Sequence, residues 1–152
     1  MNRSLLALFL LSAASVGAAH AEDIRGRNIQ LVYQGRDATI NILKDGKIFI
    51  AQRNCGGGKL SAKEAVLGRT HSFAMRCGNE RTNRGTSRAS FTGDTLKIHI
   101  DVSFGGQSNF SEDWTISING NSCSGELGVN HTVAGPASYT ISSCRIRDGM
   151  SR

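Results

Sequence analysis

Thr95-Leu96-Lys97-Ile98-His99-Ile100-Asp101-Val102-Ser103-Phe104 is the stretch of the chain that decides the fold. Apolar and polar residues alternate through it without a break, and successive side chains of a β-strand point to opposite faces of a sheet. The residues of one face are all apolar: Leu96, Ile98, Ile100, Val102 and Phe104. We expect this face to lie against a core and the other in water, as in an antiparallel sheet.

A hairpin is predicted in the first third of the chain. Asp45-Gly46 separates two apolar-rich segments, 38–43 and 48–52, and this dipeptide favours a type I′ turn because both central positions need φ > 0. A two-residue turn would place Ile42 beside Phe49, so that both faces of the hairpin would be apolar near the turn.

Asn119-Gly120 predicts a second hairpin between segments 114–118 and 121–129. With a two-residue turn, Cys123 would lie opposite Ile116 and face the core.

Further strands are expected at the outer positions 28–34, 72–77, 86–92 and 138–146, with a tight turn at Thr92-Gly93-Asp94. The pattern is weakest in 54–70, where Glu64 to Leu67 could form one helical turn, and in 78–85, a polar, arginine-rich stretch expected to be a loop. The sequence therefore predicts an all-β fold, an antiparallel β-sandwich or small barrel of about eight strands built from hairpins.

The N-terminus has the pattern of a secretory signal peptide. Arg3 precedes the apolar run Leu5 to Leu11, and Ala19-His20-Ala21 supplies small residues before a cleavage site after Ala21. The apolar run is far shorter than the roughly 20 residues that cross a bilayer, so no membrane span is expected. We expect residues 1–21 to be removed and 22–152 to form a single β-domain in the periplasm or outside the cell.

Four cysteines lie after the expected cleavage site. An even number in an exported protein predicts two disulfides, and four cysteines allow three pairings. Because their spacings are similar, we favour the pairs Cys55 with Cys77 and Cys123 with Cys144. The absence of Cys-x-x-Cys spacing and of ligand-like histidine spacing argues against a metal site.

The formal net charge of +6 is concentrated in the first part of the chain. One group of basic residues stands out for its single acidic neighbour, Glu80: Arg76, Arg81, Arg84 and Arg88. The planar guanidinium donates two parallel hydrogen bonds to a phosphate or carboxylate, so these residues predict a patch for a polyanion such as lipopolysaccharide or an acidic glycan. Nucleic acid is a less favoured partner, because the sequence offers no exposed aromatic platform on which bases could stack.

The chain contains no recognisable catalytic motif. His71, His99 and His131 are the candidate bases near neutral pH, but no serine occupies a Gly-x-Ser-x-Gly context. Glu112-Asp113 is an adjacent pair whose side chains would point to opposite faces of a strand, which does not suit paired-carboxylate catalysis. Gly56 to Lys59 lacks the spacing of a phosphate loop. The sequence therefore predicts no catalytic residue and no cofactor.

Five short stretches are spread over the chain after residue 21: 22–27 (EDIRGR), 46–49 (GKIF), 91–96 (FTGDTL), 122–124 (SCS) and 144–149 (CRIRDG). They resemble a group of small uncharacterised secreted proteins of alphaproteobacteria. The resemblance implies export and a cysteine near each end of the last third of the chain. It implies no activity and no site residue.

Taken together, these features lead us to expect a non-enzymatic binding protein for an anionic envelope component. Two other classes stay open. A pocket holding His71 or His131 near a carboxylate and a hydroxyl would favour a small periplasmic hydrolase. A protruding, ordered loop between Cys55 and Cys77 would favour a secreted inhibitor of another enzyme. The sequence leaves the oligomeric state undefined.

Overall fold

The computed structural model describes residues 23–104 and 108–149. The signal peptide predicted for residues 1–21, with its cleavage site, lies outside these residues. The strands are β1 (Arg27–Tyr33), β2 (Arg36–Ile42), β3 (Lys47–Gln52), β4 (Ser61–Val66), β5 (Thr70–Cys77), β6 (Glu80–Thr92), β7 (Thr95–Phe104), β8 (Ser108–Asn119), β9 (Ser122–His131) and β10 (Gly135–Asp148). A single 3-10 turn, η1 (Gly56–Gly58), follows β3.

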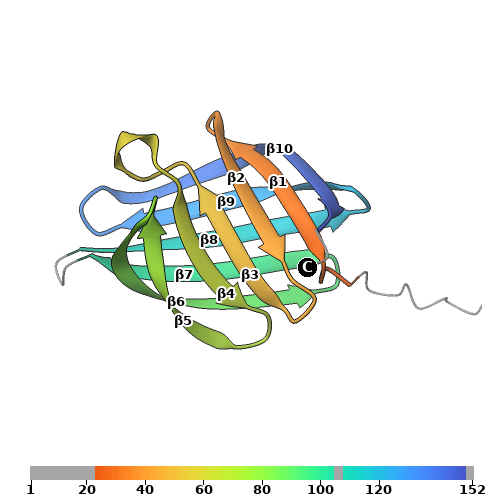
Figure 1. Ribbon diagram of the computed structural model, residues 1–152. Coiled ribbons are helices and arrows are strands. Elements are labelled where there is room, and N and C mark those ends of the chain that lie inside the picture. The colour runs from red at the N-terminus through yellow and green to blue at the C-terminus, as the bar shows by residue number, and fades with distance from the viewer. Residues whose placement is uncertain (1–22, 105–107, 150–152) are drawn as a thin grey trace, which may run out of the picture.

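Every strand pairs antiparallel with its neighbours in the chain, and β1 pairs with β10 to close the sheet into a barrel (Figure 1). The all-β prediction is confirmed. The sandwich and the count of about eight strands are wrong, because the structure is a closed barrel of ten strands. Among the described residues no helix is long and apolar enough to cross a membrane.

The core fills the barrel with inward-facing aliphatic side chains. The alternation in the deciding stretch is confirmed, since Leu96, Ile98, Ile100 and Val102 are all buried on β7. Opposite them, β1, β2 and β3 contribute the isoleucines Ile29, Ile40, Ile42, Ile48 and Ile50.

The hairpin at Asp45-Gly46 has a different register from the one predicted. The Gly46 N–H donates to the Leu43 carbonyl at 3.0 Å, and the Leu43 N–H donates to the Lys47 carbonyl at 2.8 Å. Only Gly46 takes a positive φ, +85°, so the loop is a turn followed by a left-handed glycine. Ile42 therefore pairs with Ile48. This one-residue shift turns Phe49 outward, where it is 41% exposed, so the prediction of two apolar faces is wrong.

The β8–β9 hairpin is also shifted from its predicted register. Its loop is Gly120-Asn121, with Asn119 pairing Ser122, so Cys123 lies opposite Ile118 and not Ile116. The shift is two residues. Because side chains alternate with period two, Cys123 stays on the same face of β9 and packs partly buried against the core.

Two segments that lack apolar alternation are strands. Residues 64–67 form no helical turn; Glu64 to Val66 belong to β4, whose inward positions Ser61 and Lys63 hide the period because they are polar. Residues 80–85, predicted as part of a loop, lie in β6. There Gly85 faces inward without a side chain, because a Cβ would lie 2.4 Å from Cζ of Phe73.

The disulfide pairing is confirmed. Cys55, beside η1, is bonded to Cys77 at the end of β5. Cys123, near the start of β9, is bonded to Cys144 in β10. Each bond joins two neighbouring segments of the barrel wall.

Gly125 and Gly128 on β9 provide a matched test of backbone packing. A Cβ at Gly125 would lie 2.0 Å from the Thr115 carbonyl oxygen, whereas a Cβ at Gly128 would meet nothing closer than 3.7 Å. We expect Gly125→Ala to lower the free energy of unfolding by about 1–3 kcal/mol, as overpacking does. Gly128→Ala should be neutral or slightly stabilising, since it removes glycine's backbone entropy. Urea denaturation measures both, and equal midpoints would contradict this packing.

Candidate functional site

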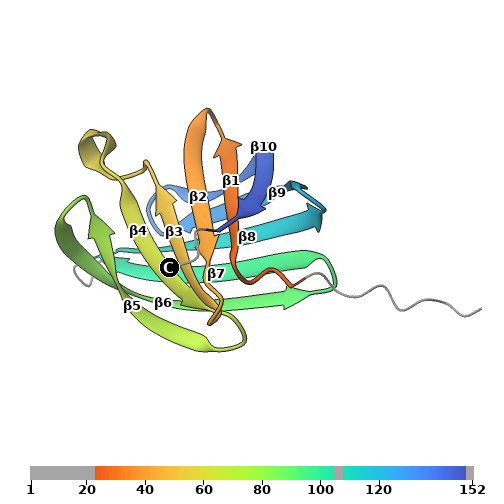
Figure 2. The same ribbon diagram turned by 45° about the vertical axis from the view of Figure 1, so that its right-hand side comes forward.

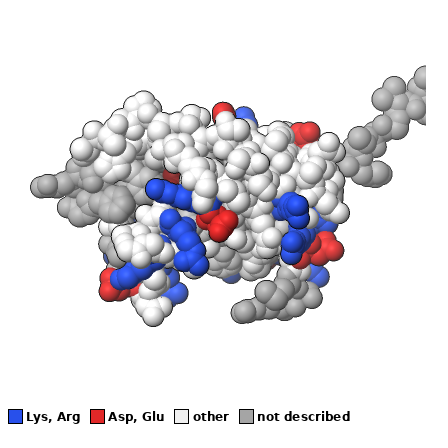
Figure 3. All heavy atoms as spheres, turned by 90° about the horizontal axis from the view of Figure 1, so that it is seen from above, with Lys and Arg blue, Asp and Glu red and all other residues white. Residues whose placement is uncertain are grey.

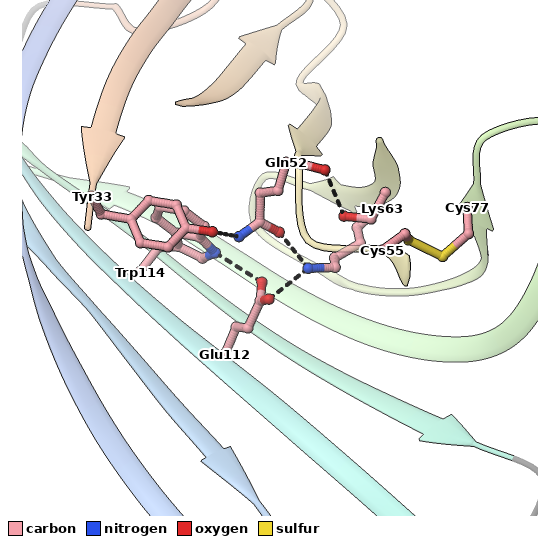
Figure 4. A network of polar contacts seen from close by, with 8 residues as sticks. Tyr33, Gln52, Cys55, Lys63, Cys77, Glu112 and Trp114 are labelled. Atoms are coloured by element: carbon pink, nitrogen blue, oxygen red, sulfur yellow. Dashed lines mark hydrogen bonds and ion pairs between the residues drawn. A yellow bond between two sulfur atoms is a disulfide. The ribbon is translucent and has the colours of Figure 1, made fainter. Parts of the chain in front are cut away.

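An ion pair crosses the interior of the barrel. Lys63 on β4 and Glu112 on β8 both point inward, with Nζ 2.6 Å from Oε1. Their side chains are 0% and 2% exposed. Because β4 and β8 are separated by β5, β6 and β7 in the wall, the pair joins distant parts of the barrel (Figure 4).

Further hydrogen bonds surround the ion pair. Lys63 also donates to Oε1 of Gln52 on β3, and the Gln52 amide nitrogen donates to the Tyr33 hydroxyl at 3.1 Å. Trp114 Nε1 donates to Oε2 of Glu112 at 3.2 Å. No buried side-chain nitrogen or oxygen in the described part of the chain lacks a partner. Such full pairing is what makes a buried polar network tolerable.

Burial also affects the titration of the network. Loss of solvation lowers the pKa of Lys63, and the neighbouring Glu112 carboxylate acts in the opposite direction. Burial raises the pKa of Tyr33, only partly offset by the hydrogen bond from Gln52. The Tyr33 hydroxyl therefore keeps its proton at neutral pH.

A pocket of about 340 Å³ lies at one end of the barrel. Its lining comes from β1 and the β1–β2 turn, the segment just after β3, the end of β5, and the adjoining ends of β8, β9 and β10. These ends lie at the same end of the barrel in Figures 1 and 2. Polar residues of the lining are Gln34, Arg36, Asn54, Glu112 and His131. Aromatic and apolar residues are Tyr33, Tyr139, Phe110, Met75, Leu127 and Val129.

Tyr33 and Glu112 belong to both the network and the pocket. The Tyr33 ring meets the Trp114 ring edge-on, with centroids 5.8 Å apart, and lies 6.1 Å from the Tyr139 ring at an angle of 35°. The network thus holds one aromatic wall of the pocket in place and sets a carboxylate beside it.

Of the four arginines predicted as a polyanion patch, Arg76, Arg84 and Arg88 do not line this pocket, and the side chain of Arg81 lies outside the described part of the structure. Arg76 on β5 pairs with Arg81 on β6, and Arg84 and Arg88 follow on β6. The side chains of Arg76, Arg84 and Arg88 are exposed on the outer surface. Asp101 on β7 pairs with Thr86, and so lies between the levels of Arg84 and Arg88.

The three histidines have separate environments. His99 lies on the outer surface, with its ring nitrogens 2.6 Å from Asp113 and 2.9 Å from Asp101. The hydrogen bond to Asp113, supported by Asp101, raises the pKa of His99 above its ordinary value. His71 Nε2 lies 3.5 Å from Glu64.

His131 is the histidine of the pocket, and its Nδ1 accepts the Val133 N–H at 3.1 Å. In the described residues no hydrogen bond joins His131 to Glu112 or to the Tyr33 hydroxyl. Between Cys55 and Cys77, β4 and β5 build the barrel wall. Residues 56–60, which include η1, form an exposed loop that projects from the barrel in Figure 1. No described group of three His, Cys, Asp or Glu residues is placed to hold a metal ion.

The sequence analysis missed Lys63, Gln52 and the inward role of Glu112. For Glu112 a signal exists, because it occupies the same face of its strand as Phe110, Trp114 and Ile116. For Lys63 the sequence contains no such signal, because the lysine itself interrupts the alternation of apolar residues that would mark the inward face of β4.

No family model, curated protein or solved structure matches this chain. The resemblance to small secreted proteins of alphaproteobacteria stays a prediction.

Removing one partner of the ion pair should lower the free energy of unfolding more than replacing both partners with apolar side chains. We expect Glu112→Leu to lower the free energy of unfolding by about 3–5 kcal/mol, because the Lys63 ammonium would remain buried without its counter-charge. Lys63→Met/Glu112→Leu should recover most of that loss, since two apolar side chains need no counter-charge. Urea denaturation measures both variants, with Asp45→Asn at an exposed ion pair as the control expected to change little. A double variant as unstable as the single one would contradict this account.

Proposed function

We propose that this chain is a non-enzymatic binding protein that holds a small, ring-bearing molecule in the open end of its barrel. The observation that carries the proposal is the pocket bounded by the rings of Tyr33, Tyr139 and Phe110 and by the buried carboxylate of Glu112. Its volume of about 340 Å³ lies within the range of small-molecule sites, which combine apolar walls with few polar groups.

The packing of the barrel supports this proposal. Towards the other end the interior is filled by side chains such as Ile40, Ile48 and Leu96, each 0% exposed, which leaves the interior surface at the pocket as the part that a ligand can contact. The Lys63–Glu112 network holds Tyr33 before any ligand arrives. A wall that needs no ordering on binding loses less free energy when the ligand is bound.

A bulky side chain inside the pocket should exclude ligands. We expect the uncharged fluorophore N-phenyl-1-naphthylamine to bind the protein with a rise in fluorescence. Val129→Trp, which fills the pocket from β9, should weaken this binding at least about tenfold, a loss of some 1.4 kcal/mol.

Val133→Trp is the matched control, because Val133 lies just beyond β9, is 82% exposed and does not line the pocket. It should bind the fluorophore like the unchanged protein. Equal affinities of the two tryptophan variants would place the fluorophore elsewhere, and no binding to the unchanged protein would contradict the proposal.

The exposed arginines of β5 and β6 support a second candidate function, the binding of an anionic envelope component such as lipopolysaccharide. Arg76, Arg84 and Arg88 are exposed on neighbouring strands, and no ion pair in the described part of the structure engages them. Figure 3, which looks onto the barrel from above, shows Lys and Arg in separate groups, with Asp or Glu beside them and uncharged surface in between. A specific patch must therefore be distinguished from net charge.

Retention on a heparin column distinguishes a specific arginine patch from an effect of net charge. If the arginines act as a site, Arg84→Ser/Arg88→Ser should elute at clearly lower salt than Lys44→Ser/Lys47→Ser, which removes equal charge at the β2–β3 turn. Retention of the unchanged protein should decrease as the salt concentration rises towards the physiological value, where the screening length is about 8 Å. Equal shifts of the two variants would reduce the effect to net charge.

A further inference from the structure

We infer that the pocket selects a ligand whose ring carries an uncharged hydroxyl, which accepts a hydrogen bond from Tyr33 and donates one to Glu112. The inference rests on the proposed small-molecule function and specifies the chemistry of the group that enters the pocket first.

The direction of the hydrogen bonds makes Tyr33 a donor towards the pocket. The Lys63 ammonium can only donate, so the Gln52 oxygen faces it and the Gln52 amide N–H₂ faces Tyr33. The Tyr33 oxygen therefore accepts from Gln52, and its own hydrogen stays available. No described residue accepts that hydrogen, and Tyr33 lines the pocket.

Glu112 is an acceptor towards the same space. Oε1 receives one hydrogen bond from Lys63, and Oε2 receives one from Trp114. A carboxylate offers about four lone-pair positions, so these two bonds leave acceptor capacity. Glu112 lines the pocket while its side chain is 2% exposed, and the ligand donor would lie at this small exposed surface.

The charge of this part of the pocket selects for an uncharged group. Lys63 balances the charge of Glu112 at 2.6 Å, and neither ion has another charged partner among the described residues. A ligand carboxylate placed between Tyr33 and Glu112 would meet the Glu112 carboxylate, whose counter-ion Lys63 is already paired. The arginine of the described lining, Arg36, lies at the rim, and its charge acts on the Tyr33 hydroxyl. A hydroxyl instead satisfies both Tyr33 and Glu112 without adding charge.

The walls select a ring. Tyr33 and Tyr139 face the pocket with centroids 6.1 Å apart, and Leu127 and Val129 on β9 supply aliphatic surface. Flat aromatic ligands pack well against such rings in offset or tilted geometry.

Three naphthalene probes test the inference by their dissociation constants, measured by calorimetry near pH 7. 2-Naphthol both accepts and donates, 2-methoxynaphthalene only accepts, and 2-naphthoate is an anion. We expect 2-naphthol to bind at least about tenfold more tightly than 2-methoxynaphthalene, because a hydrogen bond to a charged acceptor is a strong one. 2-Naphthoate should bind most weakly.

Variants then assign the two hydrogen bonds. Tyr33→Phe should weaken 2-naphthol and 2-methoxynaphthalene by the same factor, because both accept from Tyr33, and should leave their ratio unchanged. Lys63→Met/Glu112→Leu should bring that ratio close to one. Asp113→Leu is the matched control, since this neighbouring carboxylate on β8 points outward, and it should keep the ratio of the unchanged protein.

The outcomes separate this inference from the proposed function. Equal binding of all three probes, competing with N-phenyl-1-naphthylamine, would overturn the hydroxyl selection and leave small-molecule binding intact. Tightest binding of 2-naphthoate would place the polar group at the rim beside Arg36 and would also overturn it. Absence of binding by all three probes and by the fluorophore would overturn both.

Discussion

The Lys63–Glu112 ion pair is the interaction on which the open end of the barrel depends. Two opposite charges are held 2.6 Å apart, on side chains that are 0% and 2% exposed. Removing them from water is costly, and their attraction offsets this only when the remaining donors and acceptors are also paired. Gln52 and Trp114 supply that pairing, so four strands, β3, β4 and β8 together with β1 through Tyr33, are held in one arrangement.

Closure of the barrel gives the network a stable frame. Because β1 pairs with β10, neither of these two strands leaves an open edge that would invite aggregation. The weakest seam lies between β4 and β5, where only Ser61–Cys77 and Ala62–Arg76 pair. The Cys55–Cys77 disulfide crosses this seam at the open end, and the Ser87 hydroxyl donates to the Glu64 carbonyl at 2.8 Å. The disulfide and the Ser87 hydrogen bond thus connect the wall where β4 and β5 share few backbone hydrogen bonds.

The two ends of the barrel interior differ in chemistry. Isoleucine and leucine side chains fill one part completely, which gives stability without selecting a partner. At the other end the network leaves a tyrosine hydroxyl and a carboxylate beside aromatic walls, which gives selectivity. The outer surface, with its dispersed basic side chains, contributes net charge and long-range attraction to anions. A binding role for the interior is therefore compatible with a basic exterior.

The sequence by itself determined the strand class, the disulfide partners and the buried face of β7, because each depends on short-range alternation or spacing. It failed at Phe49, where a glycine bulge in the β2–β3 turn shifts the register by one residue, and at β4 and β6, where Lys63 and Gly85 interrupt the apolar period. Only the tertiary structure decided the site. Lys63 and Glu112 are 49 residues apart in the chain, and local pattern carries no information on which inward positions of distant strands meet. That meeting is set by the closure and register of the strands, which place the buried Lys63 opposite a carboxylate that balances its charge.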